Sequence, residues 1–163
     1  MDSLCNQGGE ENIAVTAFYC DFVSQQQQTT SNIVGAILKQ LVGRGEIAKN
    51  IREAFKKAKK EVGGRGPRLP DLVGMLRTTI ASLPKVFICL DALDECLPNY
   101  LQELLKSLRD IVREFPSTRI FLAGRPPVKE DIQRCFPKMV VIPISPNTDD
   151  IRNYVEMRLE RDI

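Results

Sequence analysis

One short apolar stretch of this chain ends abruptly in charge. Val86 to Leu90 are five consecutive apolar residues, and the acids Asp91, Asp94 and Glu95 follow almost at once. An uninterrupted apolar run of this length, rich in β-branched and aromatic residues, predicts a strand buried on both faces. We therefore predict a strand over 85–91 that delivers carboxylates to the carboxyl edge of a parallel sheet, which is where open sheets of this kind bind ligands.

The same reasoning places further strands and a series of amphipathic helices along the chain. Runs rich in β-branched and aromatic residues predict strands, and apolar residues three and four apart predict helices. Because a strand, a helix and a second strand of these lengths form a right-handed crossover, the strands over 85–91 and 119–123 should be parallel. The other expected strands cover 13–22 and 139–144, and the expected helices cover 29–42, 46–60, 69–83, 98–115, 128–136 and 147–159. In the last of these helices the residues expected to face the core are Ile151, Tyr154, Val155 and Leu159.

The pattern indicates a short polar beginning followed by one domain. We predict a flexible segment over 1–12 and a single folded domain over 13–163, long enough to bury a core. A net charge of +2 gives no overall attraction to nucleic acid or to an anionic membrane. The basic residues of 56–68 lie largely on the polar face of a predicted helix, without interleaved aromatic residues for base stacking. We expect neither a specific nucleic-acid partner nor a membrane.

The cysteines argue for a reducing compartment. Their number is odd, they form no CxxC pair, and the chain has no histidine that could complete a zinc site. Neither a disulfide framework nor a structural metal is expected, and the predicted location is the cytoplasm. The five cysteines are Cys5, Cys20, Cys89, Cys96 and Cys135.

Arg125 is the second candidate for chemistry at the sheet edge. It follows the predicted strand over 119–123 and precedes Pro126 and Pro127, which restrict the backbone and so fix where the guanidinium points. A cation-binding acid and a phosphate-binding arginine at one edge are two of the three parts that phosphoryl transfer requires. The third part, a GxxxxGK[ST] loop that cradles phosphates, is absent from these 163 residues.

An ordered set of four stretches resembles the NACHT family of STAND-class P-loop NTPases, in its fungal form. The resemblance implies an α/β fold, a three-layer αβα P-loop NTPase-like parallel sheet, here incomplete because the first strand and the P-loop are absent. Residues 13–163 would then form a partial NACHT NTPase domain. The stretches are Phe18-Tyr19-Cys20-Asp21-Phe22, Leu90-Asp91-Ala92-Leu93-Asp94-Glu95, Ile120-Phe121-Leu122-Ala123-Gly124-Arg125-Pro126 and Asp149-Asp150-Ile151-Arg152-Asn153-Tyr154.

The resemblance also implies roles for the edge residues. As the Walker B acid, Asp91 would bind Mg²⁺, and Asp94 or Glu95 would polarise the attacking water. Arg125 would be the sensor-1 group that contacts the γ-phosphate of ATP or GTP. The implied biology is signal transduction in an innate-immunity-like incompatibility protein, whereas the missing P-loop predicts that the chain alone does not hydrolyse nucleotide.

Two alternatives remain open. The chain could be a non-catalytic interaction module that associates with itself or with intact NACHT proteins, or the product of a truncated gene. It could also be a nucleic-acid-stimulated ATPase with a DExD-like box, although the weak basic patch and the missing P-loop count against this. In the family, the strand leading into the P-loop lies between those corresponding to 119–123 and 139–144. We therefore expect a contiguous three-stranded sheet, and self-association through the unpaired segment 139–144.

Overall fold

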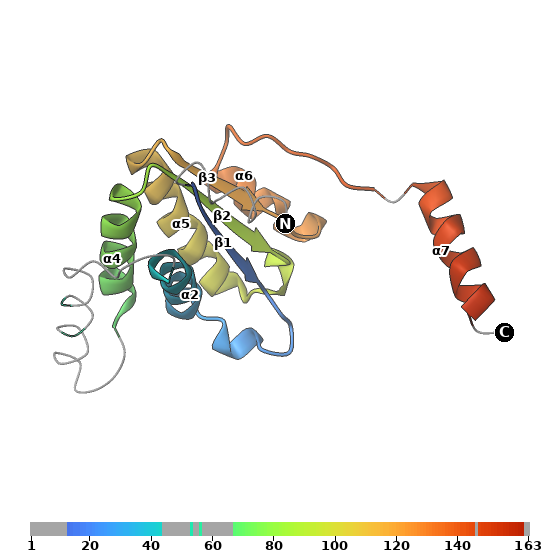
Figure 1. Ribbon diagram of the computed structural model, residues 1–163, viewed down its shortest axis with the longest axis horizontal. Helices are drawn as coiled ribbons and strands as arrows, with labels where there is room; N and C mark the ends of the chain where they lie inside the picture. The colour runs from blue at the N-terminus through green and yellow to red at the C-terminus, as the bar shows by residue number, and fades with distance from the viewer. Residues whose placement is uncertain (1–12, 44–52, 54–55, 57–66, 146, 162–163) are drawn as a thin grey trace.

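A computed structural model describes residues 13–43, 53, 56, 67–145 and 147–161. Strands and helices alternate through most of this length, as Figure 1 shows. The elements in chain order are β1 (Ile13–Tyr19), η1 (Gln25–Gln27), α2 (Thr30–Val42), α4 (Leu69–Ala81), β2 (Lys85–Asp91), η2 (Leu93–Glu95), α5 (Pro98–Glu114), β3 (Thr118–Leu122), η3 (Pro126–Val128), α6 (Lys129–Cys135) and α7 (Thr148–Arg161).

The sheet contains three parallel strands in the order β1-β2-β3. This confirms the predicted α/β class, the parallel crossover and the contiguous set of three strands. The register pairs Tyr19 with Asp91 and Leu90 with Leu122, so all three strands end at the same edge. β1 ends at Tyr19 and not at Phe22, because the chain turns away from the sheet into η1.

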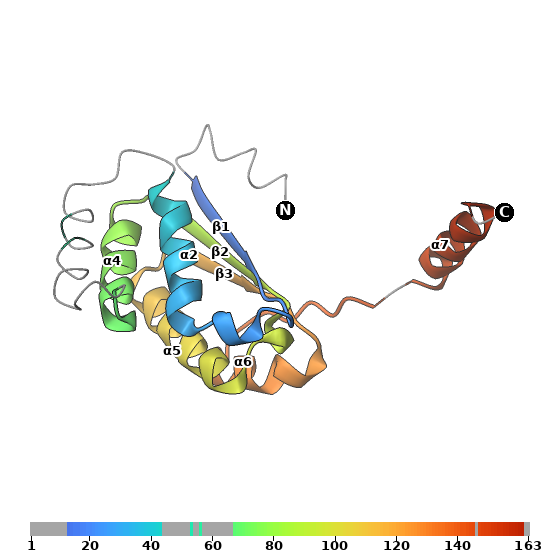
Figure 2. The ribbon, with the colours of Figure 1, turned by 90° about the horizontal axis from the view of Figure 1, so that it is seen from below.

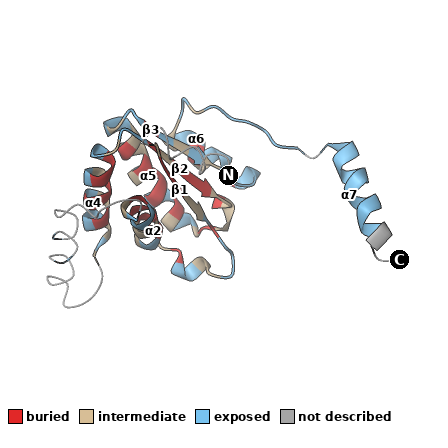
Figure 3. Cartoon of the chain, viewed as in Figure 1, coloured by how far each residue is buried: buried red, intermediate tan, exposed pale blue. Residues whose placement is uncertain are grey.

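Helices α2, α4 and α5 pack on one face of the sheet. Figure 2 shows α2, α4 and α5 side by side against that face, and buried residues line the helix sides that meet the strands (Figure 3). η3 and α6 add Val128 and Ile132 to the same core. The second helical layer of the expected three-layer arrangement is not found among the described elements. The helix predicted over 98–115 forms as α5, and its fully buried side chains repeat at helical spacing: Leu104, Leu105, Leu108 and Ile111.

The outer edge of β1 is closed by a side chain. The Gln40 amide on α2 donates to the Ala17 carbonyl (2.8 Å) and accepts from the Ala17 N–H (3.0 Å). A single side chain thus supplies the donor and the acceptor that a neighbouring strand would supply. Because unpaired strand edges are sites of aggregation, this contact protects one side of the sheet.

The predicted strand over 139–144 is wrong. The structure has no strand there, and the segment leads away from the domain as an extended connection to α7 (Figure 1). Val140, Ile142 and Ile144 are 88%, 77% and 93% exposed. A strand needs a hydrogen-bonding neighbour, and none of the described elements lies beside this segment, so its β-forming sequence does not become a strand.

The last helix forms, but its predicted orientation toward the core is wrong. α7 lies apart from the sheet in both ribbon views, and the apolar side chains that were expected to be buried are exposed (Figures 1 and 2). The helix is amphipathic, and none of the described elements covers its apolar face. Of the predicted helix over 46–60 the structure describes residues 53 and 56 alone, and the predicted segment 1–12 lies outside the described residues. None of the described helices combines the length and the apolar character needed to cross a membrane.

Candidate functional site

The carboxyl ends of the three strands are held together beyond the last ladder bonds. The Cys20 N–H donates to the Asp91 carbonyl (3.0 Å), and the Ala123 N–H donates to the Leu90 carbonyl (2.9 Å). The Ala123 carbonyl in turn accepts from the Leu93 N–H (3.1 Å). These bonds fix the loop after β2 between the loops after β1 and β3, and this edge carries all four residues that the sequence singled out.

Asp91 is the last residue of β2 and is half-buried. Its Oδ1 accepts from the N–H of Ala92 (2.7 Å), which has a φ of 54°, a left-handed conformation that is uncommon for alanine. The Tyr19 hydroxyl also hydrogen-bonds to Asp91, which raises the pKa of Tyr19, and the negative charge of Asp91 adds to the shift. The sharp turn at Ala92 starts the loop that carries the next two acids.

Asp94 joins this loop to the end of β3. Its Oδ1 accepts from the backbone N–H of Arg125 (2.9 Å), and its Oδ2 lies 3.6 Å from Nε of the same arginine. The Asp94 side chain is 13% exposed and that of Arg125 is 78% exposed. Arg125 therefore reaches the sheet edge that carries the acids, but the acid it contacts is Asp94 and not Asp91, with which the sequence pattern paired it. Most of the arginine side chain is open to solvent.

Gly124 is where this close approach demands a small residue. A Cβ on Gly124 would lie 2.8 Å from Cγ2 of Val128 and 3.3 Å from Oδ1 of Asp94. The glycine between β3 and Arg125 thus lets the η2 loop come close enough for Asp94 to reach the Arg125 amide.

Glu95 holds the loop that follows β1. Its Oε2 accepts from the Phe22 N–H (2.8 Å), and its carbonyl accepts from Nε2 of Gln25 (3.0 Å). Both acids predicted to act on water are therefore engaged with protein donors. They differ in that Asp94 directs both oxygens at Arg125, whereas Glu95 uses Oε2 for Phe22, and its Oε1 has no hydrogen-bond partner among the described residues.

The acidic residues at this edge fit a Mg²⁺ ion only when a phosphate ligand binds together with the metal. No group of three or more histidine, cysteine or acidic side chains suited to a metal occurs in the described part of the chain. Mg²⁺ commonly takes one or two carboxylates and completes its coordination with water and substrate phosphates. Asp91 meets that requirement as a single carboxylate, so it fits a metal–nucleotide complex and not a separate metal site.

Sequence reasoning missed a pair of thiols at this edge. Sγ of Cys20, just after β1, lies 3.2 Å from Sγ of Cys96, just after η2, and both cysteines are buried. Their hydrogen bond raises the pKa of Cys20, and burial adds to the shift. The same bond lowers the pKa of Cys96, because it favours a thiolate there. The signal was present in the sequence, since Cys20 lies near the end of one predicted strand and Cys96 follows the acidic loop after another. Their separation along the chain hides the contact.

A glutamine beside this edge escaped prediction as well. Oε1 of Gln28 accepts from the Asp21 N–H (3.1 Å), and Nε2 of Gln28 donates to the Asp21 carbonyl (2.8 Å). The side chain is buried, and it folds the segment after β1 back on itself. A polar tract in the sequence gave no indication of this pairing.

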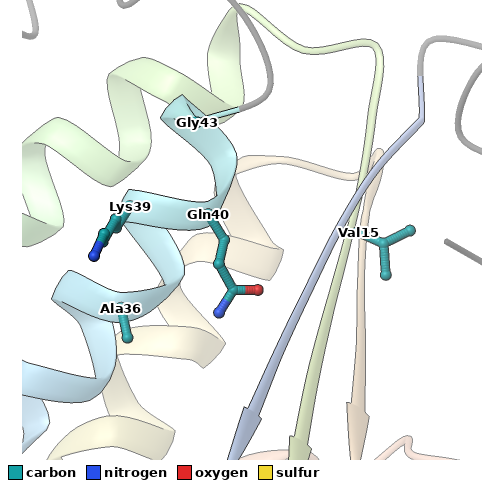
Figure 4. A pocket seen from close by; sticks show the side chains of 5 residues that line it. All are labelled: Val15, Ala36, Lys39, Gln40 and Gly43. Atoms are coloured by element: carbon teal, nitrogen blue, oxygen red, sulfur yellow. The ribbon is translucent and has the colours of Figure 1, made fainter.

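A hollow of about 530 Å³ lies elsewhere on the molecule. It sits between the carboxyl-terminal half of α2 and the beginning of β1, and none of the predicted site residues lines it. Figure 4 shows that the Gln40 amide reaches from the helix toward the strand across this hollow. Its lining residues are Val15, Ala36, Lys39, Gln40 and Gly43.

Comparison with known proteins agrees with this architecture. The structure of the Aeropyrum pernix ORC1 protein in complex with DNA is similar, with a TM-score of 0.56 and 14% sequence identity. The similarity covers 98% of this chain and 38% of the ORC1 chain, so the present chain spans well under half of that protein. At this identity the likeness shows the fold alone, which is of the P-loop NTPase-like α/β type.

Sequence comparison supplies the family. The search of curated proteins found no match. The family model described as "Nephrocystin 3, N-terminal" matches residues 1–125, more than half of the chain, and this range includes the sheet and all four candidate site residues. The chain therefore belongs to the nephrocystin 3 N-terminal family.

Proposed function

We propose that this chain is part of a NACHT-type nucleoside-triphosphatase module and that its carboxyl sheet edge contacts the phosphates and Mg²⁺ of a bound ATP or GTP. One observation carries the proposal: Asp91, Asp94, Glu95 and Arg125 come from two separate strands and meet at one edge of a parallel sheet. Ligands of open parallel sheets bind at that edge. In this proposal Asp91 holds Mg²⁺ and Arg125 contacts the γ-phosphate.

The hydrogen bonds divide the roles of the two remaining acids. Polarising a water requires a carboxylate oxygen that is not already committed to a protein donor. Asp94 directs Oδ1 to the Arg125 amide and Oδ2 to the guanidinium, so its role is to position the arginine. Glu95 accepts from the Phe22 N–H through Oε2, which leaves Oε1 to polarise a water. Of these two acids we therefore assign the polarisation of the attacking water to Glu95.

These residues supply only part of what hydrolysis requires. Mg²⁺, when bound with nucleotide, would neutralise developing charge on the phosphate oxygens. Without a GxxxxGK[ST] loop in the sequence, the contacts of Asp91 and Arg125 must act with no phosphate cradle. Two isolated charge contacts rarely outweigh the roughly 4 kcal/mol or more that ligand immobilisation costs. The chain alone should therefore bind nucleotide weakly and not turn it over.

The family form, the signalling output, the nucleotide preference and the cellular location are also part of this proposal. The fungal form of NACHT, the incompatibility-type signalling output and the ATP or GTP preference rest on the resemblance of the motifs. A cytoplasmic location is supported by the free thiols of Cys20, Cys96 and Cys135, which suit a reducing compartment.

A metal titration tests the site. Mn²⁺ with ATP should broaden the backbone resonances of Tyr19 and Ala92 in an NMR experiment on the whole chain, and Asp91→Asn should abolish the broadening. The matched control, Asp149→Asn on the detached helix α7, should leave it unchanged. Equal broadening in the wild type and Asp91→Asn, or none in the wild type at millimolar concentrations, would overturn the assignment of Asp91.

A second candidate function is a non-catalytic interaction module that associates with copies of itself or with other NACHT proteins. Among the described strands none pairs with the outer side of β3, and segment 139–144 is apolar and exposed. These two features favour the module, because a strand-forming sequence and an unpaired sheet edge are complementary. Sedimentation velocity tests this: the wild type should self-associate with rising concentration, and Val140→Lys with Ile142→Lys should remain monomeric. A wild type that stays monomeric at high concentration would remove self-association from the proposal.

A further inference from the structure

The Cys20–Cys96 pair lies where two loops of the sheet edge already meet. Besides the thiol contact of 3.2 Å, the Glu95 carboxylate accepts from the Phe22 N–H, and the Gln25 side chain donates to the Glu95 carbonyl. These bonds hold the segments after β1 and after η2 side by side. Both cysteines therefore sit on backbone that neighbouring contacts fix on either side.

We propose that Cys20 and Cys96 are a redox modification site that forms a reversible intramolecular disulfide. A disulfide has an S–S distance of about 2.05 Å, so the two sulfurs need to approach by about 1.2 Å. Rotation about the two Cα–Cβ bonds can contribute to this approach. The contact joins side chains 76 residues apart in the sequence, and both are free thiols.

A peroxide of the hydrogen peroxide class supplies the oxidising equivalents. One thiol loses its proton, and the thiolate attacks a peroxide oxygen. The O–O bond breaks, a sulfenic acid forms, and the departing hydroxide takes up the released proton to become water. The second thiol then attacks the sulfenic sulfur, the S–O bond breaks, and another water leaves with the proton of the thiol. The balance is two thiols and one peroxide giving one disulfide and two waters.

The bond would join loops that carry the candidate site. Cys96 is the residue after Glu95. Cys20 lies shortly before Phe22, and the Phe22 N–H donates to the Glu95 carboxylate. Closing a covalent loop of this length restricts the unfolded chain, so the oxidised form should melt on the order of 5–15 °C higher than the reduced form. This inference does not depend on whether the chain binds nucleotide.

Peptide mapping of the whole chain tests the proposal. After treatment with hydrogen peroxide under native conditions, blocking of remaining thiols and non-reducing digestion, a linked peptide pair containing Cys20 and Cys96 should appear, two hydrogens lighter than the reduced pair. Dithiothreitol should remove it and should reverse the rise in melting temperature. Cys96→Ser should lose both signals, whereas Cys135→Ser on α6 should keep both.

The opposite pattern refutes the site. If peroxide modifies Cys135 while Cys20 and Cys96 are recovered as free thiols after unfolding, the pair is inert core packing. The wild-type peptide map needs no variant, so the proposal stays testable even if Cys96→Ser fails to fold. A melting-temperature rise that survives in Cys96→Ser would also refute it, since that rise would come from another modification.

Discussion

Replacing Asp94 with alanine should destabilise the protein far more than replacing its partner Arg125. Asp94 accepts the backbone N–H of Arg125 at 2.9 Å with a side chain that is 13% exposed, whereas the guanidinium contact is longer, 3.6 Å, and its arginine is 78% exposed. A hydrogen bond to a charged group contributes about 1.5–3 kcal/mol, and an exposed ion pair about 0–1 kcal/mol. Asp94→Ala removes both contacts, while Arg125→Ala removes only the second.

The expected losses are therefore roughly 2 kcal/mol for Asp94→Ala and under about 1 kcal/mol for Arg125→Ala. In a domain of this size 1 kcal/mol corresponds to about 2–4 °C in melting temperature. Urea unfolding followed by circular dichroism gives the free energies directly. Asp94→Asn is the matched control, because its amide oxygen can still accept the Arg125 N–H, and it should lie between the other two.

A double-mutant cycle isolates the cause. If the backbone bond dominates, the coupling energy between Asp94→Ala and Arg125→Ala should be under about 1 kcal/mol, well below the whole loss in Asp94→Ala. Equal losses for the two single variants, or an Asp94→Asn variant as unstable as Asp94→Ala, would show that the charge pair and not the backbone acceptor stabilises the loop.

Four other outcomes follow from the same contacts. Ile88→Ala, in a fully buried position of β2, should cost about 2–5 kcal/mol in chemical denaturation, whereas Asp91→Ala at the sheet edge should cost much less; the reverse order would contradict the assignment of Asp91 to the site. Gly124→Ala should lose about 1–3 kcal/mol, because the added Cβ meets Cγ2 of Val128 at 2.8 Å; a neutral result in thermal melts would mean that the loop shifts freely. In hydrogen exchange the amides of Val140–Ile142 should exchange much faster than that of Ile88, and equal protection would show that this segment is paired after all. Calorimetry with MgATP should give no dissociation constant in the low micromolar range, and one found there would reveal a phosphate site beyond the two charge contacts.

Local pattern was sufficient for most of the framework. The apolar run before Asp91 predicted the central strand, and apolar residues three and four apart predicted the helix over 98–115 that forms as α5. The parallel arrangement of β2 and β3 followed from the helix between them, since parallel strands are joined by crossover connections of that length. These features depend on residues a few positions apart, so the sequence alone determined them.

Tertiary structure decided the features that depend on distant partners. The segment 139–144 has the composition of a strand, yet whether it becomes one depends on a neighbour that its own residues cannot supply. The apolar face of α7 predicted burial, but burial also depends on a partner surface that the helix itself cannot supply. In the structure this face is exposed.

At the sheet edge the sequence determined which residues arrive, and the tertiary structure decided what each one contacts. Asp94 and Arg125 are brought to one edge by the order of the strands, but the bond of Asp94 to a backbone amide depends on the close approach that Gly124 permits. The thiol pair of Cys20 and Cys96 and the closure of the Ala17 edge by Gln40 arise in the same way. Each joins side chains or backbone groups from separate elements, and such contacts have no periodicity along the chain by which a sequence pattern could reveal them.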